Sequence, residues 1–203
     1  MQTLIRNNRY RLKPHEIVAL EKMRETEARN VLVIGDLHEP FCLEGYLDWC
    51  LEQYETFNCT SVVFIGDVID NHYSSYHEAS ADGLGGLDEL ELAIKKISKW
   101  YEAFGDVGTK VIIGNHDRII MRKAQTSSIP SKWIKSYKEV LHTQCYTEHY
   151  VGKNFRVYGT QVGCGINHKS YAMAYAKYGK RPAVGCAVVL NNGTLPINLL
   201  MPL

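Results

Sequence analysis

The sequence predicts an α/β fold with β-sheets flanked by helices and a β-rich C-terminal part. Up to about residue 117, three short apolar runs rich in β-branched residues alternate with amphipathic helical segments. Beyond about residue 142, short apolar stretches are broken by glycines instead. A strand-helix-strand-helix-strand order followed by strands favours an α/β sheet that the later strands extend or cover. The 203 residues are enough for one domain with a real core.

The overall composition argues against a membrane-spanning protein and leaves the other classes of protein open. The chain has 23 Lys and Arg against 22 Asp and Glu, which argues neither for nor against a nucleic-acid partner. No apolar run approaches the roughly 20 residues of a membrane span, and the start, MQTLIRNNRYRLK, lacks the apolar core of a secretory signal. We therefore expect a cytoplasmic protein with no membrane partner, in which six cysteines without a C-x-x-C pair are reduced and partly buried.

Residues 1–29 are expected to form a basic arm and a helix, ahead of a main domain at 30–203. The helix is expected to begin at Pro14, because proline suits a first helical position, and Ile17, Leu20 and Met23 repeat at helical spacing. The segment is either a peripheral helix with a solvated arm or an arm that touches nucleic acid.

The elements of the main domain follow from their hydrophobic patterns. Buried strands are expected where β-branched residues run together, and helices where apolar residues recur every three or four positions. A hairpin is expected around Asn191, Asn192 and Gly193, within 183–200. The other elements, in order, are strand 31–36, helix 43–57, strand 61–67, helix 87–104, strand 110–117 and a helical stretch at 131–141.

Three successive strands end in a glycine followed by polar side chains. Their sequences are GDLH, GDVID and GNHD. One Gly-Asp after a strand is usually a turn, but the carboxyl ends of neighbouring strands in an open α/β sheet line the binding crevice. Glycine at each end lets backbone and ligand approach closely. The donors expected to converge are Asp36, His38, Asp67, Asp70, Asn115 and His116.

This donor set suits divalent cations. Carboxylate, imidazole and amide oxygen together favour Mn²⁺, Fe²⁺, Zn²⁺ or Ni²⁺, one or two per chain. An aspartate can bridge two such ions, and two ions about 3.5–4 Å apart can hold a hydroxide and clamp a phosphoryl oxygen.

The three motifs, in this order, resemble the signature of the calcineurin-like metallophosphoesterases: D-x-H, then G-D-x-x-D, then G-N-H-[D/E]. The resemblance is clear over residues 30–125. The helical segment at 76–104 and the tail at 157–203 are similar to those of phage-type members. It implies a calcineurin-like phosphoesterase fold. If the chain is phage-encoded, the expected location is the cytoplasm of the host cell.

The resemblance also implies roles for single residues. Asp36 and His38 would bind a first metal, Asp67 would bridge both, and Asn115 would bind the second. His116 would protonate the leaving oxygen or stabilise the transition state.

The remaining residues of these motifs have supporting roles in this interpretation. Asp70 would orient His116, as a carboxylate fixes the tautomer of an imidazole. Asp117 is expected to shape its loop rather than react. Arg118 and His77 are candidate substrate-binding residues, and Asn71 is an alternative to His77.

The chain departs from the family pattern downstream. Members of the family carry one histidine ligand after a later strand and two more in a G-H-x-H motif. This chain has no G-H-x-H, all three ligands are missing at the expected spacing, and the sequence around 142–150 resembles the site of an internal deletion. His142 and His149 are the possible substitute ligands, and His168 is a weaker one.

Three functions remain open from the sequence. The first is a metal-dependent phosphoester hydrolase that attacks a phosphomonoester or phosphodiester with a metal-bound hydroxide, with nucleic acid or a nucleotide as candidate substrate. The second is a degenerate, non-catalytic protein of this fold that binds a metal weakly, or a partner or nucleic acid. The third is a nucleic-acid binder that uses the basic arm with Arg118, Arg122 and Lys123. The sequence leaves the oligomeric state open.

Overall fold

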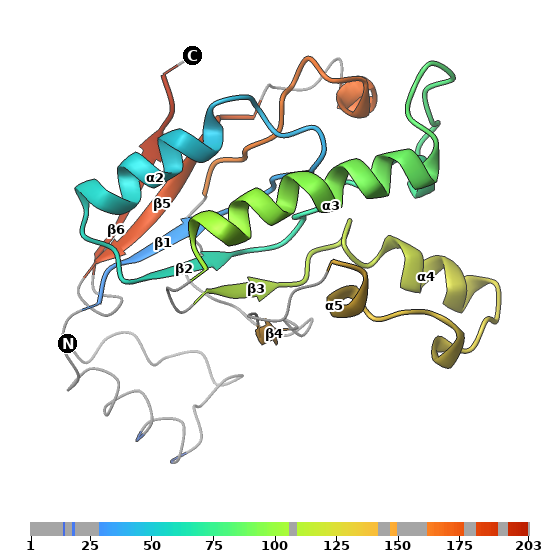
Figure 1. Ribbon diagram of the computed structural model, residues 1–203, viewed down its shortest axis with the longest axis horizontal. Coiled ribbons are helices and arrows are strands. Elements are labelled where there is room, and N and C mark those ends of the chain that lie inside the picture. Colours follow the sequence, from blue (N-terminus) through green and yellow to red (C-terminus); the bar gives the residue numbers. More distant parts are fainter. Residues whose placement is uncertain are drawn as a thin grey trace, which may run out of the picture.

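A computed structural model of the chain describes residues 29–105, 109–141, 147–149, 162–176, 182–190 and 195–202, together with the single positions 14 and 18. It contains a six-stranded sheet in the order β4-β3-β2-β1-β5-β6, with helices packed on it (Figure 1). The predicted α/β class with a β-rich C-terminal part is confirmed. The predicted N-terminal arm and helix lie almost entirely outside the described residues.

The sheet joins a parallel half to an antiparallel half. Strands β1 (Val31–Ile34), β2 (Ser61–Phe64), β3 (Lys110–Ile112) and β4 (Thr147–His149) are parallel to one another. Strand β5 (Gly185–Leu190) pairs antiparallel with both β1 and β6 (Leu195–Leu200). The predicted C-terminal hairpin is therefore confirmed as the β5–β6 pair, and residues 191–194 between its strands lie outside the described part of the chain.

Two helices cover one face of this sheet, α2 (Tyr46–Thr56) and α3 (Gly86–Ala103) (Figure 1). The strands alternate between buried and half-buried residues, because successive side chains point to opposite faces. The buried set packs with the apolar stripes of both helices in one core, whose central members are Leu32, Ile34, Val62, Phe64, Tyr46, Cys50, Ile97 and Trp100. The predicted helices at 43–57 and 87–104 are confirmed: α2 is a few residues shorter than predicted, and α3 is shifted by one residue.

Short helices surround the carboxyl ends of the parallel strands. They are η1 (His72–Ser74), α4 (Ile119–Thr126), η2 (Ser131–Trp133), α5 (Tyr137–Val140) and η3 (Tyr171–Ala176). The predicted single helical stretch at 131–141 is wrong: η2 ends at Trp133 and a new helix begins after Ser136. Ser136 forms a capping box with Glu139, which starts α5 where one longer helix was expected.

The described part of the chain holds no helix that is both long and apolar enough to cross a membrane. Five cysteines are free there, and all but Cys42 are buried. The burial of these five agrees with the expectation, their reduced state stays a prediction, and Cys145 lies outside the described residues.

Candidate metal centre

The three polar motifs follow strands that are direct neighbours in the sheet. Strands β3, β2 and β1 lie side by side and parallel, so their carboxyl ends meet at one edge. The pairing continues beyond the strands, since the His38 N–H donates to the Asp67 carbonyl at 2.9 Å and the Asp70 N–H donates to the Glu39 carbonyl at 3.0 Å. The predicted meeting of the three strand ends is confirmed, and main-chain hydrogen bonds fix the first two loops against each other.

Three motif residues adopt a backbone conformation that is unfavourable for side chains other than glycine. Asp36, His38 and Asp67 have φ angles of 46°, 50° and 50°. Left-handed backbone costs about 1–3 kcal/mol per residue, and such residues concentrate at functional sites. Asp, Asn and His tolerate this region better than most residues. The fold therefore holds these side chains at some energetic cost in positions that an ordinary turn would not give.

Two of the motif glycines let the loops touch. A Cβ atom on Gly66 would lie 2.8 Å from the Cα atom of Gly114, and Gly66 itself has a φ of 112°. A Cβ atom on Gly114 would lie 2.2 Å from Oδ1 of Asp67. We expected these glycines to admit a ligand. In the structure, they bring the loop after β3 directly against Asp67.

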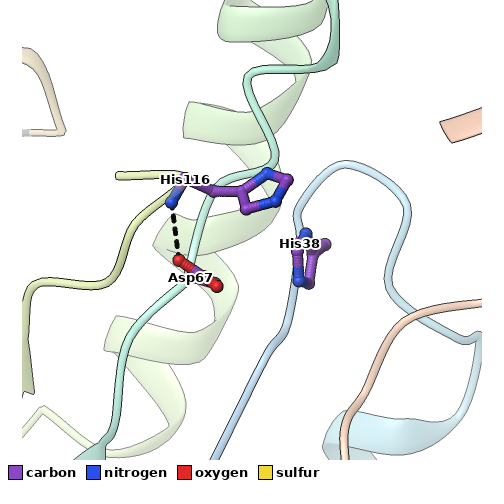
Figure 2. Close-up of side chains that lie close together, drawn as sticks. All are labelled: His38, Asp67 and His116. Atoms are coloured by element: carbon purple, nitrogen blue, oxygen red, sulfur yellow. Dashed lines mark hydrogen bonds between the residues drawn. The ribbon is translucent and has the colours of Figure 1, made fainter. Parts of the chain in front are cut away.

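The side chains of His38, Asp67 and His116 converge at this edge (Figure 2). Each offers a ligand atom, and these three atoms lie within 4.8 Å of one another. The two imidazole rings meet edge to face with centroids 4.5 Å apart. The main-chain N–H of His116 donates a hydrogen bond to Oδ1 of Asp67 at 2.8 Å. One carboxylate and two imidazoles are a donor set that borderline divalent cations accept, so the residues fit a metal ion.

The Asp36 carboxylate adds negative charge beside this cluster. Burial raises the pKa of Asp36, and the charge of Asp67 raises it further, while His38 and His116 oppose the shift. A carboxylate whose pKa is raised by burial and by a neighbouring negative charge is stabilised in its ionised form by a bound cation. Asp36 is not among the three residues whose ligand atoms lie within 4.8 Å of one another, so its role as a metal ligand stays a prediction.

Asp70 orients both histidines through different atoms. Its Oδ1 lies 2.6 Å from Nδ1 of His38, whereas its main-chain oxygen lies 2.7 Å from Nδ1 of His116 and its Oδ1 is 3.4 Å from that nitrogen. Ionised carboxylates and carbonyls only accept, so Nδ1 of each ring carries the hydrogen and Nε2 is left for a metal or a substrate. The resemblance implies that Asp70 orients His116. In the structure, the shorter contact to His116 comes from the Asp70 main-chain oxygen, and the Asp70 carboxylate lies nearer to His38 than to His116.

The charge state of His38 reflects the same neighbours. Burial lowers the pKa of His38, but the hydrogen bond to Asp70 and the negative charges of Asp70, Asp67 and Asp36 outweigh burial and raise it. The electrostatic potential around His38 is thus negative, which favours a cation beside this side chain.

Asp117 holds the second and third loops together. Its carboxylate, on a residue only 6% exposed, accepts hydrogen bonds from the main-chain N–H groups of Asp67, Val68, Ile69 and Gly114 and from the Tyr137 hydroxyl, at 2.8–3.2 Å. Burial raises its pKa to about 6, although these hydrogen bonds oppose the shift. The expectation that Asp117 shapes its loop agrees with this geometry, but its bond to the β2 loop has no signal in the sequence.

Asn115 and Arg118 are exposed, and metal binding by Asn115 stays a prediction. Both line a pocket of about 470 Å³ with Ile113, Gly114, Arg122 and Gln125. Asn115 lies between Gly114, which packs on Asp67, and His116 of the cluster. The structure therefore places Asn115 next to the candidate metal ligands, at the border of a second hollow.

The loop after β2 contains two candidate substrate-binding residues, Asn71 and His77, which lie in different surroundings. Asn71 donates from its side chain to the His116 carbonyl at 3.0 Å, so it supports the third loop. His77 is exposed, and its main chain is hydrogen-bonded to the Ser75 side chain. A substrate contact by His77 stays a prediction.

The substitute ligands are placed only in part. His142 lies outside the described residues. For His149 only the backbone is described: it is the last residue of β4 and pairs with Ile112 of β3. That register puts the His149 backbone at the same edge of the sheet as the three motifs.

Comparison with known proteins identifies the family. A family model described as calcineurin-like phosphoesterase matches residues 29–180, which include all three motifs and most of the chain. A search of curated proteins finds no match. The resemblance of the motifs is thereby confirmed over a longer stretch than they span themselves. The chain belongs to the calcineurin-like phosphoesterase family.

Proposed function

We propose that the protein is a metal-dependent phosphoester hydrolase. The observation that carries the proposal is the convergence of His38, Asp67 and His116 from three neighbouring loops, with ligand atoms within 4.8 Å of one another. The family match supports the same chemistry. Phosphomonoesters and phosphodiesters, including nucleotides and nucleic acid, are the proposed substrates.

In this proposal, Asp36, His38 and Asp67 hold a divalent metal, and Asn115 adds a ligand for a second ion. The ions of choice are Mn²⁺, Fe²⁺, Ni²⁺ or Zn²⁺, since each accepts mixed oxygen and imidazole donors. When bound, such an ion polarises a phosphoryl oxygen and makes water a stronger nucleophile. Asp67 lies between the loops after β1 and β3, which suits a ligand shared by two ions.

His116 has the geometry of a proton donor to the leaving group. Its Nδ1 is occupied by the Asp70 carbonyl at 2.7 Å, so Nε2 is the nitrogen that faces the substrate. A protonated Nε2 can transfer its proton to the departing oxygen, a contribution of about 10²–10⁴-fold in rate. The Asn71 side chain and the Asp67 carboxylate fix the main chain of His116 on either side. The ring is therefore held in position before substrate arrives.

The test is hydrolysis of p-nitrophenyl phosphate and bis(p-nitrophenyl) phosphate by the wild type and Asp67→Asn, with Mn²⁺ or Ni²⁺ and with a chelator. Asparagine keeps an oxygen that can accept the His116 N–H, so it preserves the loop while removing the charge. We expect metal-dependent turnover in the wild type and a loss of at least about 100-fold in the variant, because loss of an outer partner of a ligand already costs 10–100-fold.

The exposed Asp82→Asn change is the matched control, and it should leave turnover unchanged. Wild-type protein that binds the metal but hydrolyses neither ester would contradict the proposal and favour a non-catalytic member of the family.

A further inference from the structure

A basic pocket adjoins the candidate metal centre. Its wall is formed by Gly114, which packs on Asp67, and by Asn115. The opposite side comes from α4, with Arg118 just before the helix and Arg122 one turn later. Residues four apart lie on the same helix face, so the two guanidinium groups point into the same space. The pocket of about 470 Å³ therefore lies beside the loop after β3 and has two arginines in its lining.

The cations of this pocket are available to a ligand. Its lining contains two arginines and two amides but no acidic side chain. Among the residues that the structure describes, neither Arg118 nor Arg122 forms an ion pair with a carboxylate, and both are exposed. Arginine without an acidic partner favours a phosphate, which it can bind through two parallel N–H donors.

An aromatic ring extends the same surface. The Arg122 guanidinium lies 5.1 Å from the centroid of the Tyr76 ring, and Nζ of Lys123 lies 5.5 Å from it. Tyr76 is still 56% exposed with both cations beside it. It belongs to the loop after β2, so it reaches α4 from a different part of the chain. Cations interleaved with an exposed aromatic ring are the arrangement by which proteins hold single-stranded nucleic acid.

We propose that the basic pocket and the adjoining surface of Lys123 and Tyr76, together termed the groove, bind single-stranded nucleic acid, with backbone phosphates on Arg118 and Arg122 and a base stacked on Tyr76. The inference rests on the proposed function, because it names the substrate class of that same site. A strand that runs through the pocket places one of its phosphodiesters at the candidate metal centre, next to Gly114.

The observations favour this ligand over two others. A small phosphomonoester needs only the metal centre and would leave Arg122 and Tyr76 without a contact. A duplex keeps its bases stacked on one another, so it offers no free base face to an exposed ring. A single strand satisfies both the cations and the ring, since every base has a face that can stack.

The experiment measures binding without catalysis. A fluorescein-labelled oligothymidylate is titrated with protein in the presence of a chelator, and Kd is followed by anisotropy at several salt concentrations. We expect Tyr76→Leu to weaken binding by at least about fivefold, within the range for loss of one stacked base, and Tyr76→Phe to change it less than about twofold. Arg122→Gln should lower the slope of log Kd against log salt by about 0.7, the value for one phosphate of a single strand.

Lys95→Gln, an exposed change on α3, is the charge-matched control and should leave Kd and slope close to the wild-type values. Arg118→Gln is a second test of the same groove, with circular dichroism as the check on folding. Equal Kd values for wild type, Tyr76→Leu and Arg122→Gln would overturn the inference, as would tighter binding of the duplex than of the single strand. Wild-type turnover of bis(p-nitrophenyl) phosphate separates the two proposals. If the wild type turns the ester over but Tyr76→Leu and Arg122→Gln bind the oligonucleotide as tightly as the wild type, only the groove is overturned. If these variants bind the oligonucleotide more weakly but the wild type does not turn the ester over, only the hydrolase is overturned.

Discussion

Single residues of the candidate metal centre make contacts through both side-chain and main-chain groups, and a sequence motif does not show which group makes which contact. Asp70 uses its carboxylate for His38 and its main-chain oxygen for His116. Asp67 offers a carboxylate to a metal and at the same time accepts the His116 N–H. A substitution at either position therefore changes a ligand and a loop together, and only variants that keep the hydrogen-bond acceptor separate the two effects.

His116 provides a sharp prediction at this scale, because one of its ring nitrogens lies within 4.8 Å of the other two donors, so His116 is either a proton donor or a metal ligand. We expect His116→Gln to lower kcat by about 10²–10⁴-fold, the usual contribution of a general acid, while the metal content stays at the wild-type level. Elemental analysis of the purified proteins measures the content, and ester hydrolysis measures kcat. Asp82→Asn, an exposed change outside the motifs, is the control, with both quantities unchanged. A fall in metal content in His116→Gln would make His116 a ligand instead.

The elements are short, and the loops that follow them carry the site. Strands expected to run to residues 36, 67 and 117 end at Ile34, Phe64 and Ile112. The motif glycine follows Ile34 directly, and one residue separates each of the other two strands from its motif glycine. Between the first two loops, hydrogen bonds such as that from the His38 main-chain N–H to the Asp67 carbonyl replace those of the ladder. Helix α4, which carries Arg122 and Lys123, was not predicted, since its eight residues show too short an apolar pattern.

At the scale of elements, Asp117 joins the loops after β2 and β3, so its replacement should loosen both. In Asp117→Asn, either orientation of the amide sets its NH₂ group against at least two main-chain N–H donors. We expect the free energy of unfolding to fall by about 2–4 kcal/mol, given about 1–3 kcal/mol for each buried group left unsatisfied.

Chemical denaturation in the presence of a chelator measures this change without a contribution from metal binding. Asp82→Asn, on an exposed loop, should lie within about 0.5 kcal/mol of the wild type. A similarly small change in Asp117→Asn would show that the two loops are held by other contacts.

For the whole molecule, metal binding and folding should be linked, because the ligands come from three separate loops that meet only in the folded state. At a free Mn²⁺ concentration of about 100 times Kd, the native state gains about 2.7 kcal/mol. For a chain of this size, that corresponds to a rise in Tm of about 5–10 °C. Differential scanning calorimetry with Mn²⁺ and with chelator measures it. The shift should vanish in Asp67→Asn; an equal shift in that variant would place the ion elsewhere.

The sequence by itself determined the fold class, the order of the strands and helices in the core, and the identity of the polar residues at the strand ends. These follow from local causes: hydrophobic period, β-branched runs, and the position of glycine before Asp36, Asp67 and Asn115. Because parallel neighbours end at one edge, the sequence also predicted that the motifs meet.

Only the tertiary structure decided which atoms meet. The hydrogen bonds of Asp70 to two histidines, those of Asp117 to the β2 loop, and the contact of Tyr76 with Arg122 each join residues far apart in the chain. Their distances depend on how the loops pack against one another, and loop packing is a property of the assembled sheet rather than of any one segment. The physical reason is that hydrophobic period fixes local structure, whereas the direction of a side chain depends on the left-handed turns and close glycine contacts that only the folded chain imposes.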